Sequence, residues 1–214
     1  MHIAELWRYP VKSLAGERLE WAAIRTDGIE GDRIVHVRAP SGRVVTSRTH
    51  PGLLSLHGTL ADQGRPAVNG SPWDDPRSLE AVRHAAGDTT FELVHSAGAE
   101  RFDVLPLSVA TDGAIVAMGV DGRRFRPNLV IGGVEGLEER AWPGRHLRLG
   151  EVVISIARLR PRCVMTTYDP DTQEQSLDVL RRIVTEYAGS FALDCAVVEP
   201  GRVAVGDPVA LLPR

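Results

Sequence analysis

Short apolar runs separated by glycine, proline and aspartate constrain this 214-residue chain more than any other feature. Such punctuation ends regular structure every few residues, and it is typical of β-strands joined by tight turns. The segment 40–43, Pro-Ser-Gly-Arg, predicts one such turn between two strands of a hairpin. The runs that read as strands are 3–9, 19–25, 34–39, 44–46, 53–60, 90–95, 129–131, 152–157, 192–198 and 209–212.

Three segments read as helices. The first covers 76–86, where Asp75 is a good N-cap, Pro76 a good first residue and Gly87 a good stop. The second begins near Asp112, and the third covers 177–188. The spacing of the third predicts a buried face made of Leu177, Leu180, Val184 and Tyr187. Many strands with few, scattered helices predict a mainly β protein, a β-barrel decorated by helices.

Composition excludes several classes of function. The net charge is −3 and no run of basic residues stands out, which argues against a nucleic-acid partner. No apolar stretch is long enough to span a bilayer, and the N-terminal residues do not read as a signal peptide. The expectation is a cytoplasmic protein with no membrane partner. The two cysteines, Cys163 and Cys195, form no Cys-x-x-Cys pair, which excludes zinc fingers and Cys-ligated iron–sulfur clusters.

One residue stands out in the charge pattern. The chain has 24 arginines and a single lysine, Lys12. Codon usage that favours arginine explains most of this bias. A lysine that persists under such a bias is a candidate for a position that needs a compact ammonium, which a planar guanidinium does not replace.

Cys163 is the candidate for chemistry. It follows Arg162 at the end of a strand-like run, and a neighbouring guanidinium lowers the pKa of a thiol and favours the thiolate. A thiolate serves as a nucleophile or as a soft metal ligand, whereas a lone cysteine is also often a small buried hydrophobe. Cys195 lies in the apolar run 191–198 and fits that second interpretation.

Several other segments suit an anion. Lys12 and Ser13 offer an ammonium and a hydroxyl side by side after Pro10, although a solvated loop lysine is the more common case. Arg33 follows a glycine-punctuated turn, where it is a candidate to point toward the same anion, the alternative being that Asp32 and Arg33 serve only the turn. Pro127 predicts an extended backbone at Arg126, which would fix that guanidinium where a strand begins. The pair 111–112 opens a helix, whose free N–H groups also favour anions.

Taken together, these segments resemble a known family. Tyr9-Pro-Val-Lys-Ser13, Gly31-Asp-Arg33, Arg126-Pro-Asn128 and Arg162-Cys163, in this order, resemble the MOSC family of molybdenum cofactor-binding domains. The segment from Arg162 to Thr172 is similar to that of the mitochondrial amidoxime reducing components, a branch of this family. The resemblance implies a MOSC N-terminal β-barrel domain over 1–95 and a MOSC domain over 96–214, mainly β with a few helices.

The resemblance also implies roles for particular residues. Cys163 would be the protein ligand to molybdenum in a Mo-molybdopterin cofactor, and Asp112 would join it as a catalytic candidate. The residues that would bind the cofactor are Lys12, Ser13 and Arg33 at the phosphate, Arg126 and Asn128 in the pocket wall, and Thr111 beside the metal or pterin.

Three functions fit this chain. By resemblance, the first is a molybdenum-dependent reductase of N-hydroxylated small molecules. The sequence has no dinucleotide fingerprint, haem motif or cluster cysteines, so electrons would come from a separate protein, either ferredoxin-like or a flavin reductase. The second is a carrier of the molybdenum cofactor or of sulfur, without turnover of its own. The third is a ligand-binding barrel in which Cys163 is an ordinary buried residue.

Overall fold

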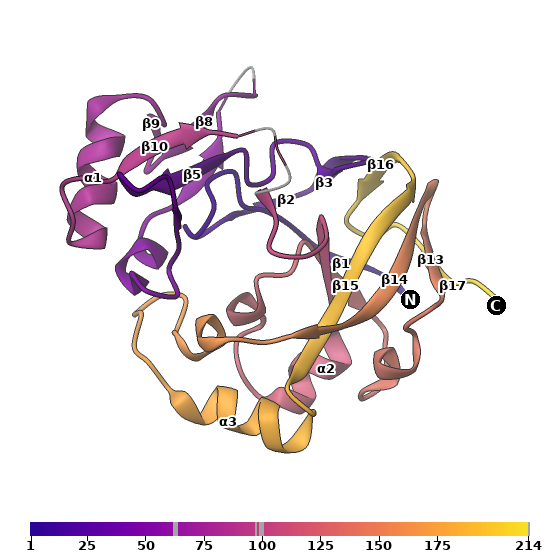
Figure 1. Ribbon diagram of the computed structural model, residues 1–214. Coiled ribbons are helices and arrows are strands. Elements are labelled where there is room, and N and C mark those ends of the chain that lie inside the picture. Colours follow the sequence, from indigo (N-terminus) through magenta and orange to yellow (C-terminus); the bar gives the residue numbers. More distant parts are fainter. Residues whose placement is uncertain (62–63, 97, 99–100, 214) are drawn as a thin grey trace.

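The computed structural model describes residues 1–61, 64–96, 98 and 101–213. Its largest element is an eight-stranded sheet in the order β17-β13-β14-β15-β11-β12-β1-β2 (Figure 1). Strands β11 and β12 are parallel, and every other neighbouring pair is antiparallel. The strands are β1 (His2–Arg8), β2 (Glu17–Leu19), β11 (Leu107–Thr111), β12 (Leu129–Gly132), β13 (His146–Leu149), β14 (Val152–Pro161), β15 (Ser190–Glu199) and β17 (Val209–Leu211).

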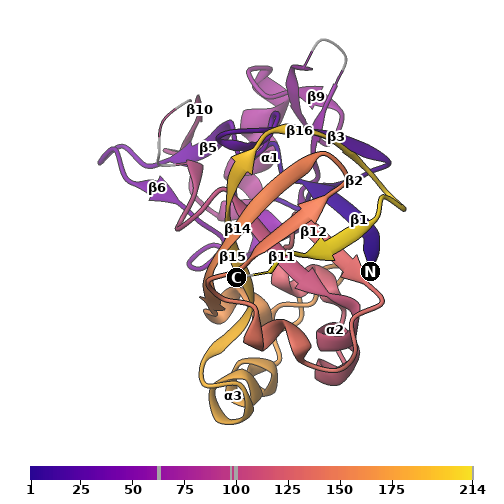
Figure 2. The same cartoon turned by 90° about the vertical axis from the view of Figure 1, so that its right-hand side faces the viewer.

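This sheet curls back on itself. Ile3 N donates to Asp207 O at 2.9 Å, and Val209 N donates to Met1 O at 3.1 Å, so β17 and the turn before it meet β1 (Figure 2). The curled sheet encloses the largest apolar core, which includes Ile3, Leu129 and Leu193. Strands from both sides of residue 95 therefore build one barrel, while the expected domain boundary at that residue stays a prediction.

A second region lies beside the barrel, at the upper left of Figure 1. Two three-stranded sheets, β10-β5-β6 and β7-β8-β9, share a core with helix α1 (Pro76–Ala86). A third small sheet, β16-β3-β4, joins the two halves of the chain. The strands are β3 (Trp21–Arg25), β4 (Gly28–Ile29), β5 (Val35–Arg38), β6 (Val44–Val45), β7 (Gly58–Leu60), β8 (Pro66–Val68), β9 (Ser71–Pro72), β10 (Glu92–His95) and β16 (Gly201–Ala204).

The signals at the ends of α1 act as the sequence predicts. The Asp75 carboxylate accepts from Arg77 N at 2.9 Å, Pro76 occupies the first turn, and Gly87 ends the helix with φ 69°. The mainly β fold with three α-helices is confirmed. In the described part of the chain, no helix has the length and apolarity needed to cross a bilayer.

One predicted strand, 53–60, is replaced in its first half by a 3-10 helix, η1 (Pro51–Ser55), before β7 begins at Gly58. Pro51 lies at the start of η1, and the adjacent Leu53 and Leu54 are both buried. A strand would have sent those two side chains to opposite faces. The prediction failed because an apolar run this short does not separate a buried helical turn from a strand.

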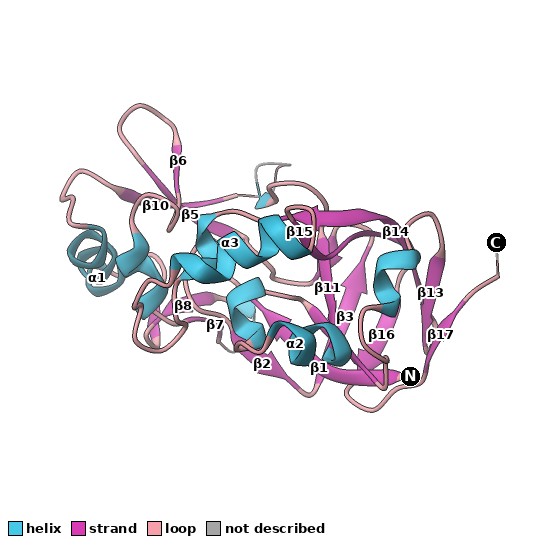
Figure 3. Ribbon diagram, turned by 90° about the horizontal axis from the view of Figure 1, so that it is seen from below, coloured by secondary structure: helices cyan, strands magenta, loops and turns pink. Residues whose placement is uncertain are grey.

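The remaining helices lie against one side of the barrel (Figure 3). Helix α2 (Asp112–Met118) and helix α3 (Leu177–Glu186) contact each other, since the Arg182 guanidinium donates to the carbonyls of Met118 and Ala117. Three further 3-10 helices complete the described elements: η4 (Gly122–Phe125), η5 (Glu138–Ala141) and η6 (Val164–Thr167).

The buried face of α3 differs from the predicted one. Val179, Ile183 and Tyr187 are buried, whereas Leu177 is 56% exposed and Val184 is 57% exposed. The helix carries two overlapping apolar stripes, and both have helical spacing. Packing against Phe191 and the α2 region selects the stripe that contains Ile183, so sequence periodicity alone did not decide between them.

This orientation gives a direct test on stability. Replacing Ile183 with alanine should lower the free energy of unfolding by about 2–5 kcal/mol, because it leaves a cavity in the α3 core. Replacing the neighbouring Val184 should change it by no more than about 0.5 kcal/mol, because that side chain faces solvent. Urea denaturation of both variants measures the difference, and equal losses would contradict this orientation of α3.

Candidate functional site

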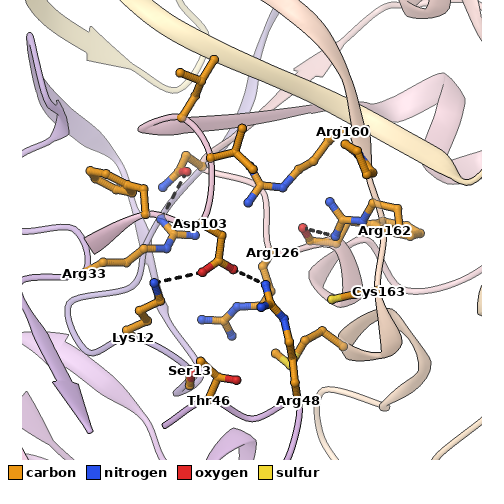
Figure 4. Close-up of a pocket in the computed structure, with 17 residues that line it drawn as sticks. Lys12, Ser13, Arg33, Thr46, Arg48, Asp103, Arg126, Arg160, Arg162 and Cys163 are labelled. Atoms are coloured by element: carbon orange, nitrogen blue, oxygen red, sulfur yellow. Dashed lines mark hydrogen bonds and ion pairs between the residues drawn. The ribbon is translucent and has the colours of Figure 1, made fainter. Parts of the chain in front are cut away.

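Six residues that the sequence singled out line one cavity of about 230 Å³ (Figure 4). They are Lys12, Ser13, Arg33, Arg126, Asn128 and Cys163. They come from the loop after β1, the turn after β4, the segment between η4 and β12, and the loop after β14. The fold thus brings together side chains that lie up to about 150 positions apart along the sequence. Other lining residues include Thr46, Arg48, Asp103, Arg160, Arg162 and Met165.

Cys163 lies between β14 and η6, and its side chain is half-buried. Its carbonyl accepts a 3.0 Å hydrogen bond from the Thr166 hydroxyl, which fixes the backbone of the loop. Arg48 lines the same cavity from the other region of the molecule. Burial would lower the pKa of Arg48, but Asp103 and Cys163 outweigh this effect and raise it above its ordinary value.

Arg162 carries unsatisfied donors. Its Nη2 donates to Phe125 O at 2.7 Å, whereas Nε and Nη1 are buried without a hydrogen-bond partner in the described structure. Burial, reinforced by the neighbouring Arg160 charge, lowers the pKa of Arg162 to about 9. Burying these two N–H donors without acceptors is costly. An anionic group in the cavity next to Cys163 would supply the acceptors that these two nitrogens lack.

Lys12 and Asp103 form the other end of the site. Lys12 is only 8% exposed, and its Nζ lies 3.0 Å from Asp103 Oδ1. The second Asp103 oxygen accepts from Arg48, as the dashed lines of Figure 4 show. Burial would raise the pKa of Asp103, but the charges of Lys12 and Arg48 hold it below its usual range. Even with this carboxylate, cations dominate the cavity wall.

A buried aspartate fixes the wall behind Lys12. Asp32 is fully buried and accepts from Tyr9 N at 2.7 Å and from Asn128 Nδ2 at 3.2 Å. It also forms an ion pair with Arg33. Asn128 Oδ1 accepts in turn from Ser108 N at 3.1 Å, which ties the network to β11 of the barrel. Arg33 and Asn128 are thus held in place before any ligand binds.

Three lining residues have a left-handed backbone: Ser13 with φ 76°, Arg33 with φ 54° and Arg126 with φ 50°. Non-glycine residues rarely adopt this conformation, which costs about 1–3 kcal/mol each and concentrates at functional sites. The extended backbone predicted at Arg126 is therefore wrong, because this residue forms the left-handed end of η4. Its guanidinium stacks over the Tyr9 ring at 4.3 Å, and burial lowers its pKa to about 10.

Thr111 and Asp112 do not line this cavity. Thr111 caps α2 by accepting from Ala114 N at 3.2 Å, and it is fully buried. The Asp112 carboxylate accepts from Gly133 N at 2.7 Å and from Val134 N at 3.1 Å, so it fixes the loop after β12. Both side chains are occupied by the architecture of α2, which the helix-start signal in the sequence reflects.

Two further lining residues, Arg48 and Asp103, were not predicted from the sequence. Arg48 follows β6 in a loop with no motif, and Asp103 lies in the segment that connects the two halves of the chain. Arg160 also lines the cavity, and the fully buried Asp194 anchors its guanidinium at 2.6 Å. These residues form ion pairs with residues far away in the sequence, and such pairs leave no local sequence pattern.

Comparison with known proteins agrees with this arrangement. The family model of the MOSC N-terminal beta barrel domain matches residues 1–101, and that of the MOSC domain matches residues 106–210. Mitochondrial amidoxime reducing component 2 of Homo sapiens is 26% identical, over 97% of this chain and 82% of the relative. Mitochondrial amidoxime-reducing component 1 of Homo sapiens is 25% identical, over 98% of this chain and 82% of the relative.

A solved structure supports the fold. The YUAD protein from Bacillus subtilis matches with a TM-score of 0.53 at 13% identity, covering 97% of this chain and 92% of that one. At this identity the likeness concerns architecture alone. Since the two family models together account for nearly the whole chain, this protein belongs to the MOSC domain family, with an N-terminal MOSC β-barrel domain followed by a MOSC domain.

Proposed function

We propose that this protein binds a molybdenum-pterin cofactor and reduces N-hydroxylated small molecules with electrons from a separate protein. The observation that carries the proposal is the shared cavity of Cys163 and a cation-rich wall that includes Lys12 and Arg33. The names of the human relatives, amidoxime reducing components, point to the same reaction class.

The residues present fit such a cofactor. Lys12, Ser13 and Arg33 would hold its phosphate, because an ammonium, a hydroxyl and a guanidinium all donate to phosphate oxygens. Arg126 and Asn128 would line its pocket, and the Cys163 thiolate would ligate the soft metal. The two unpaired nitrogens of Arg162 would gain acceptors on the cofactor. When bound, the cofactor would supply a two-electron redox centre.

The protein's own part in the reaction is to bind and orient. In the reduction of an amidoxime, the N–O bond breaks, two electrons and two protons are taken up, and an amidine and water leave. The electrons would come from a ferredoxin-like or flavin-containing reductase. Asp103 lies among Lys12 and Arg48 at the cavity wall, where it limits the positive charge that faces an incoming substrate.

Turnover with a chemical reductant tests the proposal. Protein made in a cofactor-competent host should convert benzamidoxime to benzamidine with reduced methyl viologen as the electron source. Product formation should fall to background in protein made without the cofactor. Molybdenum-loaded protein that reduces none of several amidoximes and hydroxylamines would overturn the reductase. Ready exchange of its pterin with an acceptor protein would then identify a carrier.

A further inference from the structure

A second cavity of about 200 Å³ adjoins the cofactor cavity. The two share Arg126 and Met165 as lining residues, and Met165 lies two positions after Cys163. The walls of the second cavity are largely aromatic and apolar, formed by Trp7, Tyr9, Leu54, Tyr168 and Pro170. None of these wall residues was singled out by the sequence as a binding residue for an organic molecule.

Two of the three guanidiniums at this cavity, those of Arg123 and Arg124, have carboxylate partners. Arg123 pairs with Asp121 at 2.7 Å and with Asp171 at 2.6 Å. Arg124 donates to Thr167 O at 3.0 Å and pairs with Asp169 at 2.8 Å. The positive charge of both guanidiniums is therefore neutralised within the protein, and an anionic ligand would gain little from them.

The polar ends of the Trp7 and Tyr9 side chains are occupied as well. Tyr9 Oη donates to Pro127 O at 3.1 Å, and Trp7 Nε1 donates to Glu5 at 2.7 Å. What these two rings present to the cavity is apolar surface. Arg126 differs, because its guanidinium is stacked on the Tyr9 ring and lines both cavities. The second cavity thus suits an uncharged, flat molecule far better than a ligand with many hydrogen-bonding groups.

We propose that the second cavity receives the uncharged aromatic body of the substrate, and that it selects single-ring N-hydroxylated compounds over small aliphatic ones. This inference rests on the proposed reductase function. An apolar cavity of about 150 Å³ is enough to hold benzene, so the observed volume matches one ring with a short substituent. The edge of a pterin, rich in donors and acceptors, would find few free partners among Trp7, Tyr9 and Leu54.

The test measures binding to protein without cofactor. Because Trp7 lines the cavity, benzamidoxime should quench tryptophan fluorescence in a saturable way, and Trp7→Phe should remove that change. Ala15→Leu places a larger side chain at a lining position and should weaken binding about tenfold. Val116→Leu, at a side chain that is 78% exposed on α2, is the matched control and should bind as the wild type does.

Two further measurements separate the outcomes. Tyr168→Ala removes an aromatic wall without filling the cavity, and it should also weaken benzamidoxime binding. In loaded protein, Ala15→Leu should lower kcat/KM about tenfold for benzamidoxime but not for acetamidoxime, with unchanged molybdenum content. Quenching that survives Trp7→Phe, or equal affinity in Ala15→Leu and wild type, overturns this assignment. Binding without any turnover would instead overturn the reductase function alone.

Discussion

Cys163→Ala should reduce the molybdenum content of the purified protein about tenfold or more. Loss of even an indirect support of a metal ligand costs about 10–100-fold in metal affinity, and here the proposed ligand itself is removed. The proposed phosphate-binding residues Lys12 and Arg33 should keep their positions, since their ion pairs are with Asp103 and Asp32. Elemental analysis of protein from a cofactor-competent host measures the effect.

The second cysteine provides a matched control. Cys195 is fully buried in the barrel core, and burial raises the pKa of its thiol well above the usual range. Cys195→Ala should keep the molybdenum content of the wild type, because that thiol neither lines the cavity nor ionises. Equal molybdenum in Cys163→Ala and wild type would overturn the ligand assignment.

Asp32→Ala should lower the free energy of unfolding by about 3–5 kcal/mol, because removing one partner of a buried ion pair leaves the other charge uncompensated. The substitution also leaves Tyr9 N and the Asn128 amide without their acceptor. We expect phosphate affinity to fall as well, since Arg33 loses the carboxylate that orients it. Urea denaturation and phosphate titration of cofactor-free protein measure the two effects.

Glu30 offers the matched control for that experiment. It lies two positions before Asp32 and pairs with Arg25 at 3.1 Å, and both side chains are more than half exposed. An exposed ion pair contributes about 0–1 kcal/mol, so Glu30→Ala should change stability little. If both variants lose the same stability, the buried hydrogen-bond network around Asp32 does not stabilise the cavity wall more than an exposed ion pair does.

Local sequence signals predicted the fold correctly where an element does not depend on tertiary contacts. Asp75 and Pro76 set the start of α1 and Gly87 sets its end, each through contacts within a few residues along the chain. The turn at 40–43 joins β5 to β6 for the same reason. The buried stripe of α3 was not predictable, because Leu177 and Val179 begin equally good helical stripes and only the tertiary partner distinguishes them.

The candidate site likewise contains residues that the sequence predicted and residues that only the tertiary structure identifies. Lys12, Ser13 and Cys163 stand in short segments whose chemistry is visible along the chain. Arg48 and Asp103 do not, because their importance comes from an ion pair between a loop after β6 and the connecting segment. Thr111 and Asp112 show the reverse, since their helix-start signal was real but Thr111 caps α2 and Asp112 holds the loop after β12.

The pairing of β1 with residues 206–209 has a consequence for biosynthesis. A nascent chain emerges from the ribosome N-terminus first, so β1 leaves the exit tunnel long before the segments that complete its barrel. Until then β1 has an open edge, and Lys12 is not yet packed in one cavity with Cys163. The proposed cofactor would therefore be captured only after the barrel is complete, and a ribosome stalled in the α3 region would display a chain unable to retain it.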